Sequence, residues 1–331
     1  MGALIKTVLV IVGLLALVLV GGYFVLKRGD IPYETLASKY ESAASRYVDL
    51  PDQVHMHYRD EGNPNGPTIL LIHGYSASLH TWEPWVHKLG DEYHLVSIDL
   101  PGHGLTRAPA GYRASIPAFV DDIAAFVHAY GLQHFSIAGN SMGGNVAWEY
   151  ALAHPDQLEA LILVDAGGWA HSSTNQPWFF KAISNPTFSP ILVNLDNTAL
   201  LRSGLRSSFA DPAKATDAMI TRYVELSRAP GHRDILLQIM LTQRNPATPE
   251  RLAAIHTPTL ILWGDQDHLI PPADAGRFHD AIAHSQEVTL ANCGHIAQED
   301  KPDETTAAVR AFMHTLTAAT SAQRQPAHAS H

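Results

Sequence analysis

The stretch "FSIAGNSMGGNVAW", residues 135–148, joins two apolar runs through a turn rich in glycine. The run before the turn has the length and composition of a buried strand, and the run after it is helical in character. Glycine at positions 139, 143 and 144 supplies backbone angles and room that larger residues lack. Such a segment is either a tight strand-to-helix connection or a turn that holds up Ser141 as a nucleophile.

The residues from Gly139 to Gly143 fit the pattern Gly-x-Ser-x-Gly, in the strand-turn-helix context that this pattern requires. The context carries most of the weight, because five-residue patterns also arise by chance. A serine hydroxyl is a weak nucleophile on its own. The hypothesis therefore demands a base near Ser141 and a group that orients the base.

The ends of later apolar runs supply candidates for both roles. His295 follows the last run as a candidate base, and Asp265 and Asp267 follow the run before it. The chain order serine, aspartate, histidine is typical of this kind of nucleophile turn. Asp267 is preferred as the acid, because Asp265 directly follows the strand, where it can cap the turn. Asp165, after an earlier strand, is kept as an alternative acid.

The negative oxygen of a tetrahedral intermediate needs hydrogen-bond donors. The backbone amide of Met142 is the first candidate, since it lies at a helix start directly after the nucleophile. The amide of Tyr75 is the second, because it follows Gly74 on the loop after the run "TILLIHG". His73 and His103 are interpreted as residues that hold the neighbouring loops.

The rest of the chain alternates compact apolar runs with helical segments such as 116–131. Strands buried on both faces and separated by helices indicate a mostly parallel, doubly wound α/β sheet. Two short alternating runs precede them and predict a pair of strands. The expected strands lie at 46–50, 54–62, 68–74, 94–100, 135–140, 158–166, 258–265 and 287–295.

Nearly ninety residues between Gly167 and Ile255 lack a convincing strand. A structureless loop of that length is improbable in a compact domain, so we expect a helical cap over the carboxyl ends of the strands. The cap is inserted between the sixth and seventh strands. The expected divisions are an anchor at 1–28, a stalk at 29–46, core at 47–168, cap at 169–255, core at 256–318 and a disordered tail at 319–331.

The N-terminal run from Thr7 to Leu26 carries no charge and is bounded by Lys6 and by Lys27–Arg28. About 20 residues at 1.5 Å each span a hydrocarbon layer of roughly 30 Å. A cleaved secretory signal is the alternative, although the residues after Val20 form a poor cleavage site. We expect an uncleaved single-pass membrane helix, and the side of the membrane that the domain faces stays open.

Composition and charge limit the possible domain number, partners and bound groups. The 331 residues include 46% hydrophobic and 16% charged residues, which suits one large globular domain with an extra segment. The net charge of −10 argues against nucleic acid as a partner. The single cysteine, Cys293, excludes an internal disulfide. His55 and His57 share a strand face, but without a third ligand no metal site is expected, and no cofactor is required.

Five motifs together resemble the α/β-hydrolase superfamily over about residues 47–316: "HGYSAS", "DLPGHG", "GNSMGG", "WGDQDHLIPP" and "GHIAQED". Within it, the chain resembles bacterial membrane-anchored lipases and esterases and the animal monoacylglycerol lipases. The resemblance supports Asp267 as the acid, because in that family the acid is usually the aspartate of a Gly-x-x-Asp pattern, which Gly264 to Asp267 match. It implies Ser141 as nucleophile, His295 as base, Asp267 as its partner, and Tyr75 and Met142 as oxyanion donors.

The expected activity is hydrolysis of lipophilic carboxylic esters through an acyl-enzyme. Ser141 argues against dehalogenases and epoxide hydrolases of this fold, which use aspartate at this turn. Carbon–carbon bond hydrolases of aromatic ring-fission products and cofactor-free haloperoxidases stay as alternatives. A catalytically inactive binding protein of the same fold is the alternative from another class. The membrane and the ester substrate are the expected partners, and the oligomeric state is left open.

Overall fold

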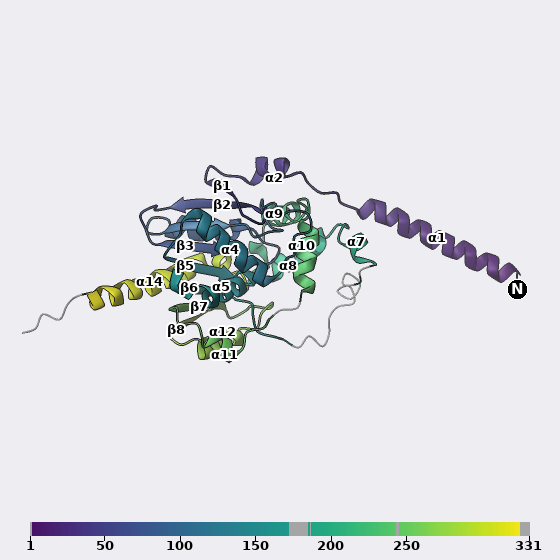
Figure 1. The fold of residues 1–331 in the computed structure, drawn as a ribbon. Coiled ribbons are helices and arrows are strands. Elements are labelled where there is room, and N and C mark those ends of the chain that lie inside the picture. Colours follow the sequence, from purple (N-terminus) through teal and green to yellow (C-terminus); the bar gives the residue numbers. More distant parts are fainter. Residues whose placement is uncertain (1, 172–184, 186, 243–244, 325–331) are drawn as a thin grey trace, which may run out of the picture.

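A computed structural model describes residues 2–171, 185, 187–242 and 245–324 (Figure 1). Its eight strands form one sheet in the order β1-β2-β4-β3-β5-β6-β7-β8. Strand β2 pairs antiparallel with β1 and β4, and every other pairing is parallel, so the predicted mostly parallel sheet is confirmed. The strands are β1 (Ser45–Asp49), β2 (His55–Gly62), β3 (Thr68–Ile72), β4 (His94–Ile98), β5 (Phe135–Asn140), β6 (Leu158–Val164), β7 (Thr259–Gly264) and β8 (Ser285–Leu290).

Hydrophobic clusters cover both faces of the sheet. Leu70 and Ile72 of β3 belong to one cluster and Ile69 and Leu71 to the other, because successive side chains of a strand point to opposite faces. All four are fully buried, which explains why the strand is a continuous apolar run. The covering helices include α3 (Glu83–Leu89), α4 (Ile116–Tyr130), α5 (Met142–Ala153), α12 (Ala273–Ala281), α13 (Ala297–Asp300) and α14 (Pro302–Arg324).

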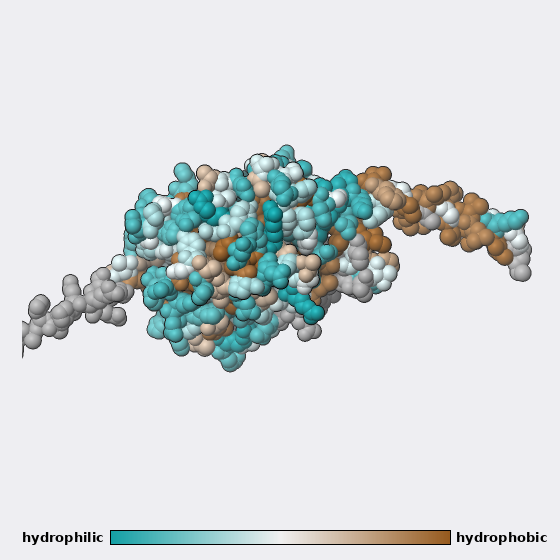
Figure 2. Space-filling model, turned by 45° about the horizontal axis from the view of Figure 1, so that its top comes forward, coloured by the Kyte–Doolittle hydropathy of each residue, from teal (hydrophilic) through white to brown (hydrophobic). Residues whose placement is uncertain are grey.

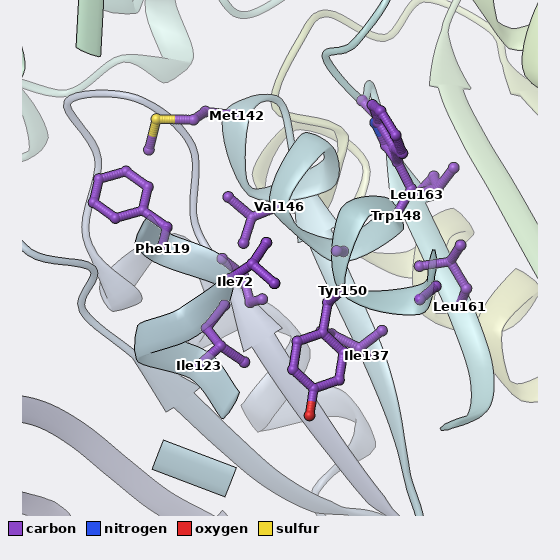
Figure 3. Close-up of a cluster of buried hydrophobic side chains, with 14 of the residues drawn as sticks. Ile72, Phe119, Ile123, Ile137, Met142, Val146, Trp148, Tyr150, Leu161 and Leu163 are labelled. Carbon is purple, nitrogen blue, oxygen red and sulfur yellow. The ribbon is translucent and has the colours of Figure 1, made fainter. Parts of the chain in front are cut away.

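Helices α4 and α5 form the layer on the face shown in Figure 3. The hydroxyl of Ser115 accepts a hydrogen bond from the Ala118 amide and caps the start of α4, and Gly131 ends the helix with a φ of 87°. These signals explain the agreement with the predicted segment at 116–131. Side chains of both helices meet those of the strands in this cluster: Ile72, Phe119, Ile123, Ile137, Val146, Trp148, Tyr150, Leu161 and Leu163.

The chain between β6 and β7 is helical where the structure describes it, as expected for a cap at 169–255. The parts of the expected cap at 172–184, 186 and 243–244 lie outside the described residues. Leu205, Phe209 and Ile220 of the cap form a small core with Ile296, beside the predicted base. The cap contains α7 (Ser189–Leu192), α8 (Thr198–Ser207), α9 (Asp217–Leu226), α10 (His232–Leu241) and α11 (Pro249–Leu252). One short turn of 3-10 helix lies in the cap, at Pro212–Lys214, and two lie in the core, at Leu79–Trp82 and Pro155–Gln157.

Helix α1 (Gly2–Leu26) projects from the domain beside the cap (Figure 1). Among the described residues, it is the helix long and apolar enough to cross a membrane, with a mean hydropathy of 2.9. A signal sequence near an N-terminus has the same properties, so length and composition alone do not separate the two.

The segments next to both ends differ from the expected stalk and tail. Residues 29–46 carry α2 (Tyr33–Tyr40), whose Leu36 is buried against Leu105 and Leu226. The segment therefore packs on the domain, because Leu36 and its tyrosine neighbours give this polar stretch an apolar face. At the other end, α14 runs to Arg324, past the expected end of the core at 318, since alanine and glutamine continue a helix well. The rest of the expected tail, 325–331, lies outside the described residues.

Candidate active site

Ser141 lies at the turn between β5 and α5 in an unusual backbone conformation, with φ 54° and ψ −118°. Such a conformation costs of order 1–3 kcal/mol for a residue other than glycine and persists only where neighbours enforce it. The Ser141 amide donates to the carbonyl of Val164 at 3.0 Å, and its carbonyl accepts from the amides of Asn145 and Gly167 at 3.1 and 2.8 Å. The strained turn is therefore held on both sides.

The glycines of the turn allow the backbone of α5 to approach the sheet. A Cβ atom at position 139 would lie 2.2 Å from the carbonyl oxygen of Gly143, and one at position 143 would lie 2.3 Å from the carbonyl oxygen of Ile72. Both distances are far below van der Waals contact, and the opposing atoms belong to the backbone. The glycines are therefore required by close packing at the start of α5.

His295 and Asp267 meet at the carboxyl ends of β7 and β8. The Nδ1 atom of His295 lies 2.7 Å from Oδ2 of Asp267, and both residues are buried. The other oxygen, Oδ1, accepts from the amides of Leu269 and Ile270 at 2.7 and 3.0 Å. Because the carboxylate only accepts, Nδ1 carries the proton and Nε2 keeps a free electron pair, as a general base requires.

The two alternative acids are engaged elsewhere. Asp265 is exposed, and its Oδ1 accepts from the Cys293 amide at 3.2 Å. Asp165 is fully buried, and its two oxygens accept from the amides of Gly264 at 2.8 Å and Ala297 at 3.3 Å. Burial raises the pKa of Asp165 well above its ordinary range, and the nearby charge of Asp267 raises it further. Asp165 thus ties the end of β7 to the loop that carries the histidine.

Two further residues hold the His295 loop, and the sequence analysis did not select either. The amide of Asn140 donates to the carbonyls of Val164 and His295 at 3.1 and 3.0 Å. Oδ2 of Asp300 accepts from the amides of Gly294 and Ala210 at 2.8 and 2.9 Å, which connects the loop to the cap. Asn140 directly precedes Ser141, and Asp300 lies in the same motif as His295, so proximity to the motifs was the available signal.

Ser141, Tyr75 and Met142 line one cavity of about 130 Å³ beneath the cap. Met142 is the first residue of α5, where backbone amides lack partners within the helix. The Tyr75 hydroxyl donates to the carbonyl of Leu236 on α10 at 3.1 Å, which ties its loop to the cap. Much of the lining is apolar, including Ile116, Pro117, Ile239 and Ile270.

His73 and His103 are buried in the loops beside this cavity, as expected for residues that hold them. Nδ1 of His73 lies 2.8 Å from the carbonyl of Gly74, and Nε2 accepts from the Leu100 amide at 3.0 Å. Nδ1 of His103 lies 3.1 Å from the carbonyl of Pro101. Burial lowers the pKa of both imidazoles, which favours their neutral form.

The histidines that share a face of β2 have partners other than a metal. His57 lies between Asp99, at 2.7 Å from Nδ1, and the hydroxyl of Ser45, at 2.9 Å from Nε2. Burial alone would raise the pKa of Asp99, but the hydrogen bond and charge of His57 outweigh it and lower that pKa. His55 lies 2.6 Å from the carboxylate of Asp49. Within the described part of the chain, no group of three or more His, Cys, Asp or Glu could hold a metal ion.

Comparison with known proteins identifies the family of the chain. The model of a family described as the alpha/beta hydrolase fold matches residues 67–302. The human monoacylglycerol lipase ABHD6 is 28% identical over 267 residues, which cover 77% of this chain and 78% of the relative. A membrane phospholipase A, described as a bacterial virulence factor, has a TM-score of 0.71 and 26% identity, covering 96% of this chain and 99% of its own. A meta-cleavage product hydrolase from Pseudomonas fluorescens IP01 has a TM-score of 0.70 at 22% identity, covering 82% of this chain and 97% of its own, and shows the fold alone.

Proposed function

Because the chain belongs to the α/β-hydrolase fold family, we propose that it is a serine hydrolase that cleaves carboxylic ester bonds of lipophilic substrates through Ser141, His295 and Asp267. The observation that carries the proposal is the buried 2.7 Å contact between His295 and Asp267. It lies near the strained turn of Ser141, because Asn140, the residue before Ser141, donates to the carbonyl of His295 at 3.0 Å. A held imidazole with a free Nε2 is the base that a serine nucleophile needs.

The reaction follows from these roles. His295 Nε2 takes the hydroxyl proton as the Ser141 oxygen attacks the ester carbonyl, and Asp267 stabilises the imidazolium that forms. The backbone amides of Met142 and Tyr75 donate to the negative oxygen of the tetrahedral intermediate. The intermediate collapses, and the alcohol leaves with the proton from His295. Water, activated by the same imidazole, then hydrolyses the acyl-enzyme and frees the carboxylic acid.

The substrate class follows from the cavity and from the relatives. The lining beside Ser141 includes Ile116, Ile239 and Ile270, which suits an acyl chain better than a polar group. The names of the relatives, monoacylglycerol lipase and membrane phospholipase A, both describe ester bonds of lipids. We therefore propose a lipid ester of the monoacylglycerol type as the substrate.

We further propose that α1 anchors the enzyme as a single membrane-spanning helix. Its uncharged run is bounded by Lys6 and Lys27, as for a helix whose ends reach the two membrane surfaces. The likeness to the membrane phospholipase A covers 96% of this chain, a share that requires at least part of α1 to be included.

A fluorophosphonate probe tests the nucleophile on the full-length protein. We expect labelling of the native chain at Ser141 and no labelling of a Ser141→Ala variant of equal thermal stability; labelling at another residue would refute the assignment. A series of glycerol and p-nitrophenyl esters of increasing acyl length then tests the substrate class. Cleavage of ring-fission dienones with no activity on any ester would favour a carbon–carbon bond hydrolase.

Extraction and intact mass test the anchor. A spanning helix keeps the protein in membranes washed with high salt, which removes only electrostatically bound proteins. The intact mass of the membrane-bound protein should include α1. A mature protein that starts after Val20 and is recovered in the soluble fraction would identify the segment as a cleaved signal.

A further inference from the structure

A second cavity, of about 750 Å³, lies where α1 meets the cap. It is lined by Leu26 at the end of α1, by Asp196, and by Arg202 and Arg206 of α8. It shares no lining residue with the cavity that contains Ser141. The proposed ester hydrolysis therefore gives it no role.

Backbone hydrogen bonds hold the lining of this cavity against the C-terminal end of α1. Lys27 forms an antiparallel bridge with Leu195, and the amide of Asp196 donates to the carbonyl of Leu26 at 2.8 Å. The amide of Arg28 donates to the carbonyl of Asn194 at 2.9 Å. The end of α1 is thus paired directly with the cap, beside α7 (Figure 1).

A second set of contacts holds the chain just after α1. Arg233 of α10 pairs with the carboxylate of Asp30 at 2.5 Å and donates to the carbonyl of Arg28 at 2.8 Å. Arg228 donates to the carbonyl of Gly29 at 2.8 Å. These bonds set the position of the cap relative to the membrane helix.

The depth of the cavity follows from the length of α1 and rests on its proposed span. The uncharged run from Thr7 to Leu26 is sufficient to cross about 30 Å of hydrocarbon. Leu26 therefore lies at the edge of the hydrocarbon layer. A cavity lined by Leu26 opens at the level of the phospholipid headgroups.

The charges of the cavity suit an anion. Arg202 and Arg206 are four residues apart in α8, so they lie on one face of the helix. Arg202 contacts Asp217 at 3.3 Å, but both side chains are exposed, so this pair is weak and can exchange for a phosphate. The carboxylate of Asp196 is neutralised by Arg28 at 2.8 Å. A guanidinium group matches the geometry of phosphate oxygens, and two of them line this cavity.

Apolar side chains are exposed before and after the cap residues 194–196, which pair with the end of α1. Figure 2 shows hydrophobic residues gathered where α1 joins the domain. Phe188, Ile191 and Leu200 of the cap are each about half exposed, at 53%, 48% and 55%. An apolar surface beside a cationic, hydroxyl-lined cavity fits a molecule with an anionic head and hydrocarbon chains.

We propose that this cavity binds the headgroup of an anionic phospholipid, with its phosphate on Arg202 and Arg206 and its acyl chains along α1. The net charge of the chain is −10, so an anionic surface repels most of the domain. The two arginines supply a local attraction at the membrane helix. The bound lipid orients the cap on the membrane and is not a substrate of Ser141.

Native mass spectrometry of the full chain, released from detergent micelles, tests the site. The protein carries Ser141→Ala so that no lipid is hydrolysed, and its intact mass reports whether α1 is present. Phosphatidylglycerol is titrated, with phosphatidylcholine and inorganic phosphate as separate arms. We expect one phosphatidylglycerol to bind in preference to phosphatidylcholine, and inorganic phosphate at the same concentration not to displace it.

Charge-matched variants locate the binding. Arg202→Gln with Arg206→Gln should weaken phosphatidylglycerol binding roughly 30-fold, from about 1 kcal/mol for each cation near an anionic lipid. Arg46→Gln with Lys88→Gln removes the same charge from solvent-accessible positions on β1 and α3, and should leave binding unchanged. Asp196→Asn should tighten it, because it removes a carboxylate from the lining and releases Arg28 from its ion pair.

Equal weakening by both double variants, or displacement by inorganic phosphate, would overturn the lipid assignment. So would unchanged binding in Arg202→Gln with Arg206→Gln. Failure of Ser141 to react with a fluorophosphonate affects none of these results, since binding is measured without catalysis. A purified chain that lacks α1 would show instead that the proposed span is wrong. The two proposals therefore fail in distinguishable ways.

Discussion

Replacing Asp267 by asparagine changes the atom that faces the imidazole and little else. Oδ1 of Asp267 accepts from the amides of Leu269 and Ile270 at 2.7 and 3.0 Å. These two donors orient the asparagine, because the opposite orientation would set its NH₂ group against them. The NH₂ group then faces Nδ1 of His295, where Oδ2 now lies at 2.7 Å.

The consequence is a change of tautomer. Nδ1 of His295 must accept from the new NH₂ group, so the ring proton moves to Nε2, which can no longer take the proton of Ser141. The same change in a serine protease lowers kcat by about 10⁴, or ~5.4 kcal/mol at 1.36 kcal/mol for each factor of ten. The two backbone hydrogen bonds survive, so we expect the unfolding free energy to fall by no more than about 1.5 kcal/mol.

The assay is kcat for a soluble short-chain ester, measured with the Tm of each variant. Asp265→Asn is the matched control, because this exposed side chain faces the Cys293 amide, and it should keep native activity. An Asp267→Asn enzyme within tenfold of the native kcat, with an unchanged Tm, would refute the assignment. Loss of activity in Asp165→Asn under those conditions would make Asp165 the acid.

Three other predictions concern the fold and the residues that support the site. Gly139→Ala should lower the unfolding free energy by about 3 kcal/mol and the Tm by several degrees, since its Cβ would lie 2.2 Å from a backbone oxygen of α5. Gly204→Ala is the control: its Cβ would have no neighbour within 4 Å, so the Tm should stay equal or rise. Asn140→Ala should lower kcat more than it changes KM, because the carbonyl of His295 loses a 3.0 Å donor; an unchanged kcat would exclude this positioning role. Burial raises the pKa of Asp122 from 3.8 to about 8, so the folded state keeps a proton that the unfolded chain releases. The unfolding free energy should therefore fall as the pH rises from about 4 to about 8, by at most about 1.4 kcal/mol per pH unit. Asp122→Asn should flatten this fall in a pH series of Tm values, and an unaltered slope would contradict it.

Much of the fold could be predicted because its signals are local. The turn around Ser141 is specified by residues within a few positions of it, and Gly139 meets a backbone oxygen of Gly143, only four residues further on. Helix α4 carries its own start and stop signals in Ser115 and Gly131. The long interval without strands predicted the helical cap for the same reason, since strand patterns are also local.

The positions of the connecting segments could not be predicted in this way. The stretch at 29–46 is polar enough to suggest a free stalk, yet Leu36 is buried between core and cap. A single leucine among polar neighbours does not show which distant residues it will pack against. The pairing of Lys27 with Leu195 is likewise a backbone contact between distant segments and leaves no trace in side-chain patterns.

The sequence by itself determined the types of the chemical groups and their order along the chain, with Ser141 before Asp267 and Asp267 before His295. It did so because strand, turn and helix preferences depend on near neighbours. Only the tertiary structure decided which of three carboxylates faces the imidazole, since that depends on the directions in which the ends of β6 and β7 leave the sheet. It also decided that Asp165 binds backbone amides, and that the residues directly after α1 pair with the cap, because both depend on contacts between residues far apart in the chain.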